Sequence, residues 1–490
     1  MLSTLILKEI HETIITYRFL IATLLCLILI PLGMYVSLKD YVQRYGEYQD
    51  SIRLYEEKAK GNINSGFRAE GYRPPSPLSI FSLGFKHTLP YKVTTSPEGE
   101  FSIEIQTISH NSESVLFGEV DFVFIMSFVL SILALIFTFN TISGEKELGS
   151  LRLVLSNAVS RWKIILAKIL GNYIVLLVPF IIGGLISLLV IVRINAFALF
   201  SRENFPSILM IFLISIVFLF AIFNLGIFLS TRSRNSITSI IISLFIWVIF
   251  VLVVPKVSSM IARVVYPIKA QQIVTIEKQM VKNSIEKELD SKRKTLLEGI
   301  LMDNGLDPQS VQLFSSEIDP AVMKALKQYD ETAIPLEAEY RERISNAVKN
   351  IERDYQNKKN TQTAISINLA RISPICSFTH ILSEISGTGT GEIENFARQA
   401  HRFQGQVEDE IYNHYFYQKY LFGSMGVGWT SKKDQAFDEG KIAVPHLVNY
   451  KHITLTQALR LSWVDILILL LFGILLFAAS FVSFLRYDVR

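Results

Sequence analysis

Long apolar runs separated by polar segments dominate the pattern along this chain. The runs cover residues 19–36, 120–140, 164–192, 206–230, 236–254 and 463–485. About 20 apolar residues in an α-helix cross a hydrocarbon layer roughly 30 Å thick. Each run therefore predicts a membrane-spanning helix. The pattern as a whole predicts a mainly α-helical polytopic membrane protein with six spans.

Residues 1–18, which precede the first run, have an amphipathic pattern. Leu2, Ile6, Ile10 and Ile14 recur at four-residue spacing, and the charged side chains lie mainly on the other side. This pattern predicts an amphipathic helix on the membrane surface. A simple N-terminal extension of the first span is the alternative, and the same pattern leaves it open.

The first long polar segment covers residues 37–119. It begins with a Tyr-rich stretch of helical character at 40–60, and a Pro-rich turn follows at 73–77. Apolar and polar residues then alternate over 91–95 and 101–107, which is typical of short strands. We therefore expect a small mixed α/β domain in this segment.

The second long polar segment covers residues 255–462. Two stretches within it, 271–302 and 334–359, are rich in Glu, Lys and Arg. They also carry apolar residues at helical spacing, for example Tyr340 and Ile344. This pattern predicts a large helical domain that contains helical hairpins or a short coiled coil.

The distribution of Lys and Arg predicts the orientation in the membrane. If the N-terminus lies inside, every inner segment is basic, including the tail at 486–490. The basic residues of these segments are Lys8, Arg18, Lys146, Arg152, Arg161, Lys163, Arg232, Arg234, Arg486 and Arg490. Short loops rich in Lys and Arg stay on the cytoplasmic side. We therefore expect both termini to be cytoplasmic and both polar domains to be extracytoplasmic.

Composition narrows the class further. The chain has 490 residues, half of them apolar, and a net charge of only +4, which gives no case for nucleic-acid binding. Cys26 and Cys376 are far apart, so a disulfide framework is not expected. Charged residues before the first run, with no small-residue cleavage site after it, argue against a cleavable signal peptide.

The segment near 143–156, between the second and third runs, carries the chemistry that bears on mechanism. It opens with the charge cluster Glu145-Lys146-Glu147, and Leu148 and Leu151 then share one side of a predicted short helix. Such a helix, parallel to the membrane and tied to two spans, can dock into a groove of a soluble partner and pass its movement on. An ordinary inner loop with an interfacial helix is the alternative, and composition alone leaves both open.

This segment resembles the coupling-helix region of type-2 ABC-transporter permeases. Their pattern is an acidic pair, a Gly, a Leu-Arg-Leu run, a Ser, and an Arg before a Lys-containing span. The matching residues are Glu145, Glu147, Gly149, Leu151, Arg152, Leu153, Ser156, Arg161 and Lys168. Residues 73–80, Ser373-Pro374, residues 387–389 with Phe396, and residues 484–490 resemble a long-chain branch of these permeases with large extracytoplasmic domains.

The resemblance implies the membrane subunit of an ATP-driven ABC exporter in a bacterial cell (inner) membrane. In that family the coupling helix inserts into a cleft of a separate ATP-binding subunit. Carried over to this chain, Glu145, Glu147 and Arg152 would contact that subunit, while Leu148 and Leu151 would pack in its cleft.

The expected partners follow from the same resemblance. They are two ATP-binding subunits, a second permease chain that is identical or a sister, and membrane lipid. The chain contains no G-x-x-x-x-G-K-[ST] phosphate loop, so ATP and Mg²⁺ would be bound by the partner subunit. We therefore expect no cofactor in this chain and no enzymatic activity of its own.

Small and polar residues inside the runs predict helix packing. Gly183 with Ser187, and Gly226 with Ser230, are small-xxx-small pairs that allow close packing and can also serve a dimer interface. The asparagines within the runs have a similar interpretation, as interhelical hydrogen-bonding groups rather than a substrate site. They are Asn140, Asn172 and Asn224.

Charged residues are scarce within the runs, which argues against a proton-driven pump or secondary transporter. Lys168 is the exception, near the start of the third run. Asp121 and Asp465 stand at the outer ends of two runs and are interpreted as membrane-interface residues, with a gate or substrate contact as the alternative.

Other chemistry has little support. His401, Glu410 and His414 come without an HExxH or CxxC motif, so no metal site is expected. No nucleophile, base and orienting residue can be grouped, so no catalytic site is expected either. Two functions other than export stay open: a membrane-anchored scaffold or sensor, and an ATP-driven complex that does mechanical work on a periplasmic partner. Substrate identity does not follow from the sequence.

Overall fold

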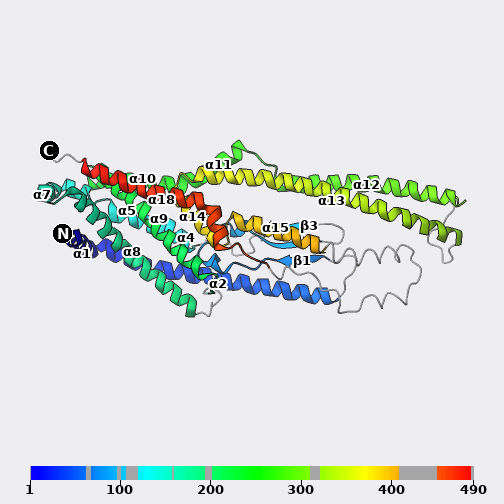
Figure 1. The fold of residues 1–490 in the computed structure, drawn as a ribbon, viewed down its shortest axis with the longest axis horizontal. Coiled ribbons are helices and arrows are strands. Elements are labelled where there is room, and N and C mark those ends of the chain that lie inside the picture. Colours follow the sequence, from blue (N-terminus) through cyan, green and yellow to red (C-terminus); the bar gives the residue numbers. More distant parts are fainter. Residues whose placement is uncertain are drawn as a thin grey trace.

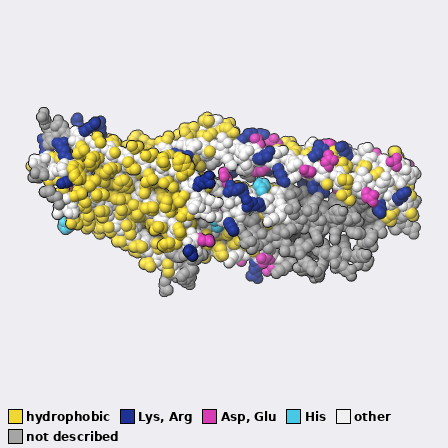
Figure 2. All heavy atoms as spheres, in the orientation of Figure 1, with side chains coloured by type: hydrophobic (Ala, Val, Ile, Leu, Met, Phe, Trp, Pro, Cys, Tyr) yellow, Lys and Arg dark blue, Asp and Glu magenta, His cyan; other side chains and the backbone are white. Residues whose placement is uncertain are grey.

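The computed structural model describes residues 2–61, 68–95, 101–105, 120–156, 159–193, 201–308, 320–407 and 450–486. The molecule is elongated, with a helical bundle at one end and a long helical hairpin at the other (Figure 1). In the described residues, six helical segments are long and apolar enough to cross a membrane. Apolar side chains cover the bundle's surface in Figure 2, with Lys and Arg at its edges. The predicted mainly α-helical polytopic membrane protein is confirmed.

Six helical segments form the candidate spans, two of them with a π-helical turn inside. They are α2 (Tyr17–Gly61); α4 (Phe122–Phe124), η3 (Ile125–Leu130) and α5 (Ser131–Thr138); α8 (Arg161–Arg193); α9 (Phe205–Arg232); α10 (Ser236–Val248), η5 (Ile249–Val253) and α11 (Val254–Val265); and α18 (Leu455–Leu485). One continuous core of buried apolar side chains joins them.

Three of these helices extend beyond the ends of the apolar runs. The α2 helix continues past residue 36 to Gly61, the fifth span continues past residue 254 to Val265, and α18 begins at Leu455 rather than at 463. A change from apolar to polar residues marks the edge of a membrane, whereas a helix ends where its backbone is capped. At α18 the cap is Thr454, whose backbone and side chain both bond Gln457.

The N-terminal helix α1 (Leu2–Ile14) is separated from α2 by a break at Ile15 and Thr16. It packs against α8, where a Cβ added to Gly171 would lie 2.8 Å from the Glu9 Cβ. An extension of the first span would have continued without this break. The chain therefore has a separate amphipathic helix that lies across the bundle.

A small antiparallel sheet follows α2. Its strands β1 (Ala69–Tyr72), β2 (Pro90–Thr95) and β3 (Phe101–Ile105) lie in that order, with Val93 opposite both Gly71 and Ile103. Helix α15 (Thr390–Val407) covers one face through Phe396 and Phe403. Alternation in the sequence predicted the β2 and β3 regions, but β1 and the covering helix came only from the structure.

The hairpin consists of α12 (Gln271–Asp303) and α13 (Pro320–Ala370), which pack side by side (Figure 1). Both predicted helices lie within these bounds. Tyr340 is fully buried between them, and its hydroxyl donates to Glu288. Ion pairs from Lys278 to Glu352 and from Arg293 to Glu337 join the two helices along their length.

A short helix, α14 (Pro374–Ile385), lies inside the bundle although it is too short to span a membrane. It contacts α9 and α18, and the ring of its Phe378 stacks on Phe218 of α9 with centroids 4.2 Å apart. Two single turns, η1 (Pro77–Ile80) and η2 (Lys86–Thr88), lie at the same end of the bundle, the end nearer the hairpin. Phe81 packs edge-on against Phe122 and Phe212 there.

Candidate functional site

The segment between α5 and α8 forms two short helices rather than one. These are α6 (Ser143–Glu147) and α7 (Ser150–Ser156). The break falls at Gly149, whose φ of 74° is in the left-handed region that glycine adopts without steric cost. The prediction of one amphipathic helix with Leu148 and Leu151 on a common side is corrected by this break, because the turn at Gly149 separates the two leucines.

Helix α6 is anchored to the turn between α9 and α10. The Ser230 hydroxyl oxygen accepts from the backbone N–H groups of Ile142 and Ser143, both at 3.1 Å. Lys146 Nζ donates to the carbonyls of Thr231 and Ser233. These bonds fix α6 to the end of the fourth span.

The acidic pair of α6 continues this anchoring in two directions. Glu147 Oε2 accepts from the Ser236 N–H at 3.0 Å, at the start of α10. Glu145 Oε1 lies 2.6 Å from Lys168 Nζ on α8, and the same ammonium lies 3.0 Å from Glu9 Oε1 on α1. One buried cation thus joins α1, α6 and α8.

The Lys168 ammonium has a physical reason to be paired. Its side chain is only 4% exposed, and an unpaired charge at such a position is strongly unfavourable. One turn further along α8, Asn172 accepts from the Thr13 hydroxyl of α1. The two contacts together hold the amphipathic helix against the third span.

The exposed face of the segment differs from the predicted contact set. Leu148 and Leu153 are 84% and 72% exposed, and Arg152 is exposed as well. Leu151 is fully buried in the chain's own core. Glu145 is turned inward toward Lys168, whereas Glu147 is exposed while holding α10. Of the five predicted contacts, Leu148, Glu147 and Arg152 therefore lie on the surface.

Both small-residue pairs pack helices of this chain. A Cβ on Gly183 would lie 2.8 Å from the Cys26 carbonyl oxygen of α2, and Ser187 donates back to the Gly183 carbonyl at 2.8 Å. A Cβ on Gly226 would overlap Thr138 Oγ1 of α5, and Ser230 holds α6 as described. Gly183 and Gly226 thus lie where helices of this same chain approach closely.

Replacing Gly226 with Ala is expected to destabilise the purified protein by about 1–3 kcal/mol, because the new methyl group overlaps Thr138 and the two helices must separate. Thermal unfolding in detergent measures the change. Gly46→Ala is the matched control: no atom lies within 4 Å of the added Cβ, so this substitution should be neutral or stabilising. Equal unfolding temperatures for Gly226→Ala and the parent chain would contradict the expected overlap.

At the opposite end of the bundle, Asp465 of α18 is fully buried. It accepts two bonds from the Arg371 guanidinium, both at 2.9 Å, and one contact of 3.0 Å from His380 Nδ1 of α14. The sequence interpreted Asp465 as a membrane-interface residue. The structure shows that it is also the centre of an ion-pair cluster, whose partners come from α14 and the residues just after α13.

A second buried carboxylate, Glu392, lies close by at the start of α15. Its oxygens accept from the Tyr450 hydroxyl at 2.7 Å and the Ile453 N–H at 3.2 Å, and His452 Nδ1 lies 2.7 Å away. Burial alone would raise the pKa of Glu392, but the His452 contact and the nearby Arg73 hold it below its ordinary value. The carboxylate is therefore ionised, and it ties α15 to the chain that leads into α18.

Asp121, Asn140 and Asn224, which the sequence also singled out, each make at least one hydrogen bond. Asp121 caps α4 by accepting from the Phe124 N–H at 2.6 Å, and it accepts from the Leu83 N–H as well. Asn140 accepts from Arg18, so it joins separate segments like Asn172. Asn224 instead donates within its own helix, to the carbonyl of Phe220.

Of the three residues considered for a metal site, only His401 belongs to the described part of the chain. His401 stacks on Phe101 with centroids 4.7 Å apart, whereas Glu410 and His414 lie outside the described residues. Within the described ranges, no group of three His, Cys, Asp or Glu residues is arranged to hold a metal ion.

Sequence reasoning missed two clusters, those around Lys168 and Asp465. Their partners are distant in the chain: Glu9 is 159 residues from Lys168, and Arg371 is 94 residues from Asp465. A lone charge in an apolar run was the available signal, because such a charge needs a partner. The sequence does not say which residue supplies it.

The fold and this site are those of a polytopic membrane protein whose helices are joined at one end by a short charged segment. The family described as "ABC-2 family transporter protein" matches residues 3–489 of the chain. The chain belongs to this family, whose members are permease components of ABC transporters that work with an ATP-binding subunit. No curated protein matches the chain.

Proposed function

We propose that this chain is the membrane-spanning subunit of an ATP-driven ABC exporter in a bacterial cell (inner) membrane. ATP and Mg²⁺ are bound by a separate subunit, present in two copies, and a second permease chain completes the complex. The end that carries α1, α6 and α7 is cytoplasmic. The exposed basic residues at this end, Lys8, Arg152, Arg232 and Arg234 among them, support this orientation.

The anchoring of α6 is the observation that carries the proposal. Its side chains and backbone hold the end of α9, the start of α10, and, through Lys168, α1 and α8. A push on this segment therefore acts on several spans at once. An isolated interfacial helix would not need these attachments.

The surface offered to the ATP-binding subunit is defined by what the chain leaves exposed. Leu148 and Leu153, both largely exposed, flank Arg152 on α7 and the turn before it. Large apolar side chains beside a cation are suited to a cleft with an apolar floor and an acidic rim. We therefore propose Leu148, Arg152 and Leu153 as the docking face, and leave out Leu151 because it is buried in this chain.

Replacing Leu148 and Leu153 together with Asp is expected to reduce co-purification with the ATP-binding subunit, and ATP-driven transport, by about tenfold or more. The reason is that two apolar anchors of 1–3 kcal/mol each are lost. Unfolding temperature should stay within experimental scatter, because both side chains are exposed. Pull-down yield and transport in vesicles are the measurements.

Lys8→Glu is the matched control for this experiment. Lys8 is exposed at the same end of the molecule and pairs only weakly with Glu12, at 3.4 Å. The Lys8→Glu substitution should leave both the pull-down yield and transport unchanged. Normal recovery of the ATP-binding subunit with the Leu148/Leu153 variant would sink the docking assignment.

A second candidate function is mechanical work on an extracytoplasmic partner. It is favoured by the hairpin, because α12 has 33 residues and reaches about 50 Å away from the bundle. Reconstitution separates the two functions. An exporter moves its substrate in vesicles that hold only the complex and lipid, whereas a mechanical device shows ATP turnover there without transport until the partner is added.

A further inference from the structure

A small pocket lies where three segments that are distant in the sequence meet, at the end of the bundle nearer the hairpin. The segments are α2, the stretch around η1 and η2, and the loop between α14 and α15. Six polar residues are among those that line it: Arg44, Arg73, Ser76, Ser79, Lys86 and Thr388. The pocket thus unites residues 73–80 with residues 387–389, two stretches that share a resemblance in the sequence but have no described function.

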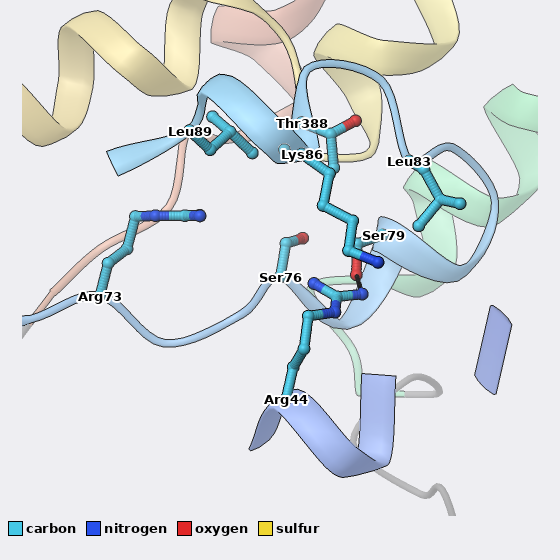
Figure 3. Close-up of a pocket in the computed structure, with 9 residues that line it drawn as sticks. Arg44, Arg73, Ser76, Ser79, Leu83, Lys86, Leu89 and Thr388 are labelled. Carbon is cyan, nitrogen blue, oxygen red and sulfur yellow. Dashed lines mark hydrogen bonds between the residues drawn. The ribbon is translucent and has the colours of Figure 1, made fainter. Parts of the chain in front are cut away.

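The pocket is strongly biased toward positive charge. Arg44, Arg73 and Lys86 all line it, and no acidic side chain does so among the described residues. Their side chains are only 14%, 9% and 16% exposed. Figure 3 shows Arg73 entering from one side and Arg44 with Lys86 from the other.

The acidic neighbours of these cations, Asp40 and Glu392, lie behind them and do not line the pocket. Asp40 accepts from both Arg44 and Lys86, at 2.8 and 2.9 Å. Arg73 donates to the Pro90 carbonyl at 2.7 Å, and its guanidinium is 3.9 Å from Glu392, a carboxylate already held by His452 and Tyr450. Burial lowers the pKa of Arg73 below its ordinary value, and nearby Arg44 acts in the same direction. An anion placed among the three cations would relieve this.

Ser76 provides an unused donor in the same place. It precedes η1 and is only 5% exposed, yet its hydroxyl makes no hydrogen bond with the described part of the chain. In Figure 3 it stands between Arg73 and the pair formed by Arg44 and Lys86. Gly387, with φ of 67°, forms the wall behind it, where a Cβ would lie 2.9 Å from Ser76 Oγ. Only glycine keeps this space for the hydroxyl.

The depth of the pocket matches the headgroup layer of a membrane. Arg18 and Arg44 bracket the apolar part of α2, and at 1.5 Å per residue they are about 39 Å apart along the helix. This length exceeds the hydrocarbon core of about 30 Å and falls within the whole bilayer thickness of about 40–45 Å, so the two ends lie at the headgroup regions. Tyr41, Tyr45 and Tyr48 follow one another at this level with ring centroids 6.0 Å apart, and Tyr is enriched at membrane interfaces.

We propose that this pocket binds a phosphate group, supplied by the headgroup of an anionic phospholipid or by a free phosphate. Arg side chains pair with phosphate oxygens through two parallel bonds, and Ser76 adds a hydroxyl donor. The cavity holds about 20 Å³, which is room for roughly one water-sized group. One phosphate oxygen therefore fits inside the cavity, while the rest of the ligand lies at its mouth. The proposal goes beyond export and does not require the ATP-binding subunit.

Binding is tested on the full chain in detergent by calorimetric titration with short-chain phosphatidylglycerol and, separately, with inorganic phosphate. Arg44→Gln and Ser76→Ala should weaken binding, the first by about tenfold, because a charge-assisted contact is lost. Arg53→Gln is the matched control on the same helix: Arg53 is 78% exposed and contacts only Glu57 in the described structure, so its affinity should equal that of the parent.

Asp40→Asn is expected to raise the affinity for the probe, and a misfolded variant would not bind more tightly. This carboxylate competes with a bound anion for Arg44 and Lys86, so its removal should tighten binding several-fold. Binding of phosphatidylglycerol alone identifies the lipid as the source. Binding of inorganic phosphate as well shows that the phosphate group suffices. The proposal is overturned if neither probe binds, if Arg44→Gln binds like Arg53→Gln, or if Asp40→Asn fails to tighten binding.

Discussion

Replacing Lys168 with Met is expected to destabilise the purified protein by about 3–5 kcal/mol, among the largest effects of any single substitution in the bundle. The Glu9 and Glu145 side chains, only 13% and 27% exposed, would then face each other without the cation they share. Helix α1 and helix α6 would both lose their ionic contact with α8. Thermal or denaturant unfolding in detergent measures the loss.

Two further variants separate this ionic effect from simple loss of a long side chain. Adding Glu9→Gln and Glu145→Gln to Lys168→Met removes the uncompensated charges and should recover more than half of the lost stability. Lys8→Met is the surface control, since Lys8 and Glu12 are both more than half exposed, and should change stability by less than about 0.5 kcal/mol. If Lys168→Met behaves like Lys8→Met, the ion cluster does not hold the helices together.

The same substitution bears on coupling. With Glu145 released, α6 keeps its bonds to α9 and α10 but loses α1 and α8. Under the proposed function, transport should fall more steeply than ATP hydrolysis, because the movement reaches fewer spans. A charge reversal at Glu145 mixes this structural effect with any effect on docking. The exposed leucines are for that reason the cleaner test of the docking face.

Asp465→Leu is the second substitution with a large expected effect, about 3 kcal/mol of lost stability. The Arg371 guanidinium, 20% exposed, and the His380 ring, 12% exposed, would lose the carboxylate that lies between them. Helix α18 would lose its polar contacts with α14 and with the end of α13. The measurement is again unfolding of the purified chain.

A double-mutant cycle measures how much of the lost stability comes from the pair formed by Arg371 and Asp465. Arg371→Met combined with Asp465→Leu removes both charges and should be less destabilised than Asp465→Leu alone. Asp354→Leu is the matched control in an exposed pair with Lys358, where a change below about 0.5 kcal/mol is expected. Additive effects of the two substitutions would show that Arg371 and Asp465 do not stabilise each other.

The two clusters lie at opposite ends of the bundle. Lys168 joins helices at the end that carries α6 and α7, while Asp465 joins them at the end that carries α14 (Figure 1). Between them, the spans are held mainly by apolar packing, as at the stacked rings of Phe218 and Phe378. Close packing at small residues and stacked rings sets how the helices approach one another, and the ionic contacts at the two ends add pairing between specific residues.

The sequence by itself determined the spans, because their signal is local. A run of about 20 apolar residues forms one helix whatever its neighbours are, and alternation over a few residues likewise indicated the regions of β2 and β3. The charged helices of the hairpin followed from helical spacing in the same way, whereas the separation of α1 (Leu2–Ile14) from the first span was decided by the structure. Such features need no knowledge of what packs against them.

Only the tertiary structure decided how these elements are joined. Lys168 finds Glu9 and Glu145, Asp465 finds Arg371, and residues 73–80 meet residues 387–389 across hundreds of residues of chain. The left-handed turn at Gly149 divided one expected helix into two and turned Leu151 inward. Pairing of this kind depends on which helices lie next to each other, and a periodic pattern in one sequence carries no information about that.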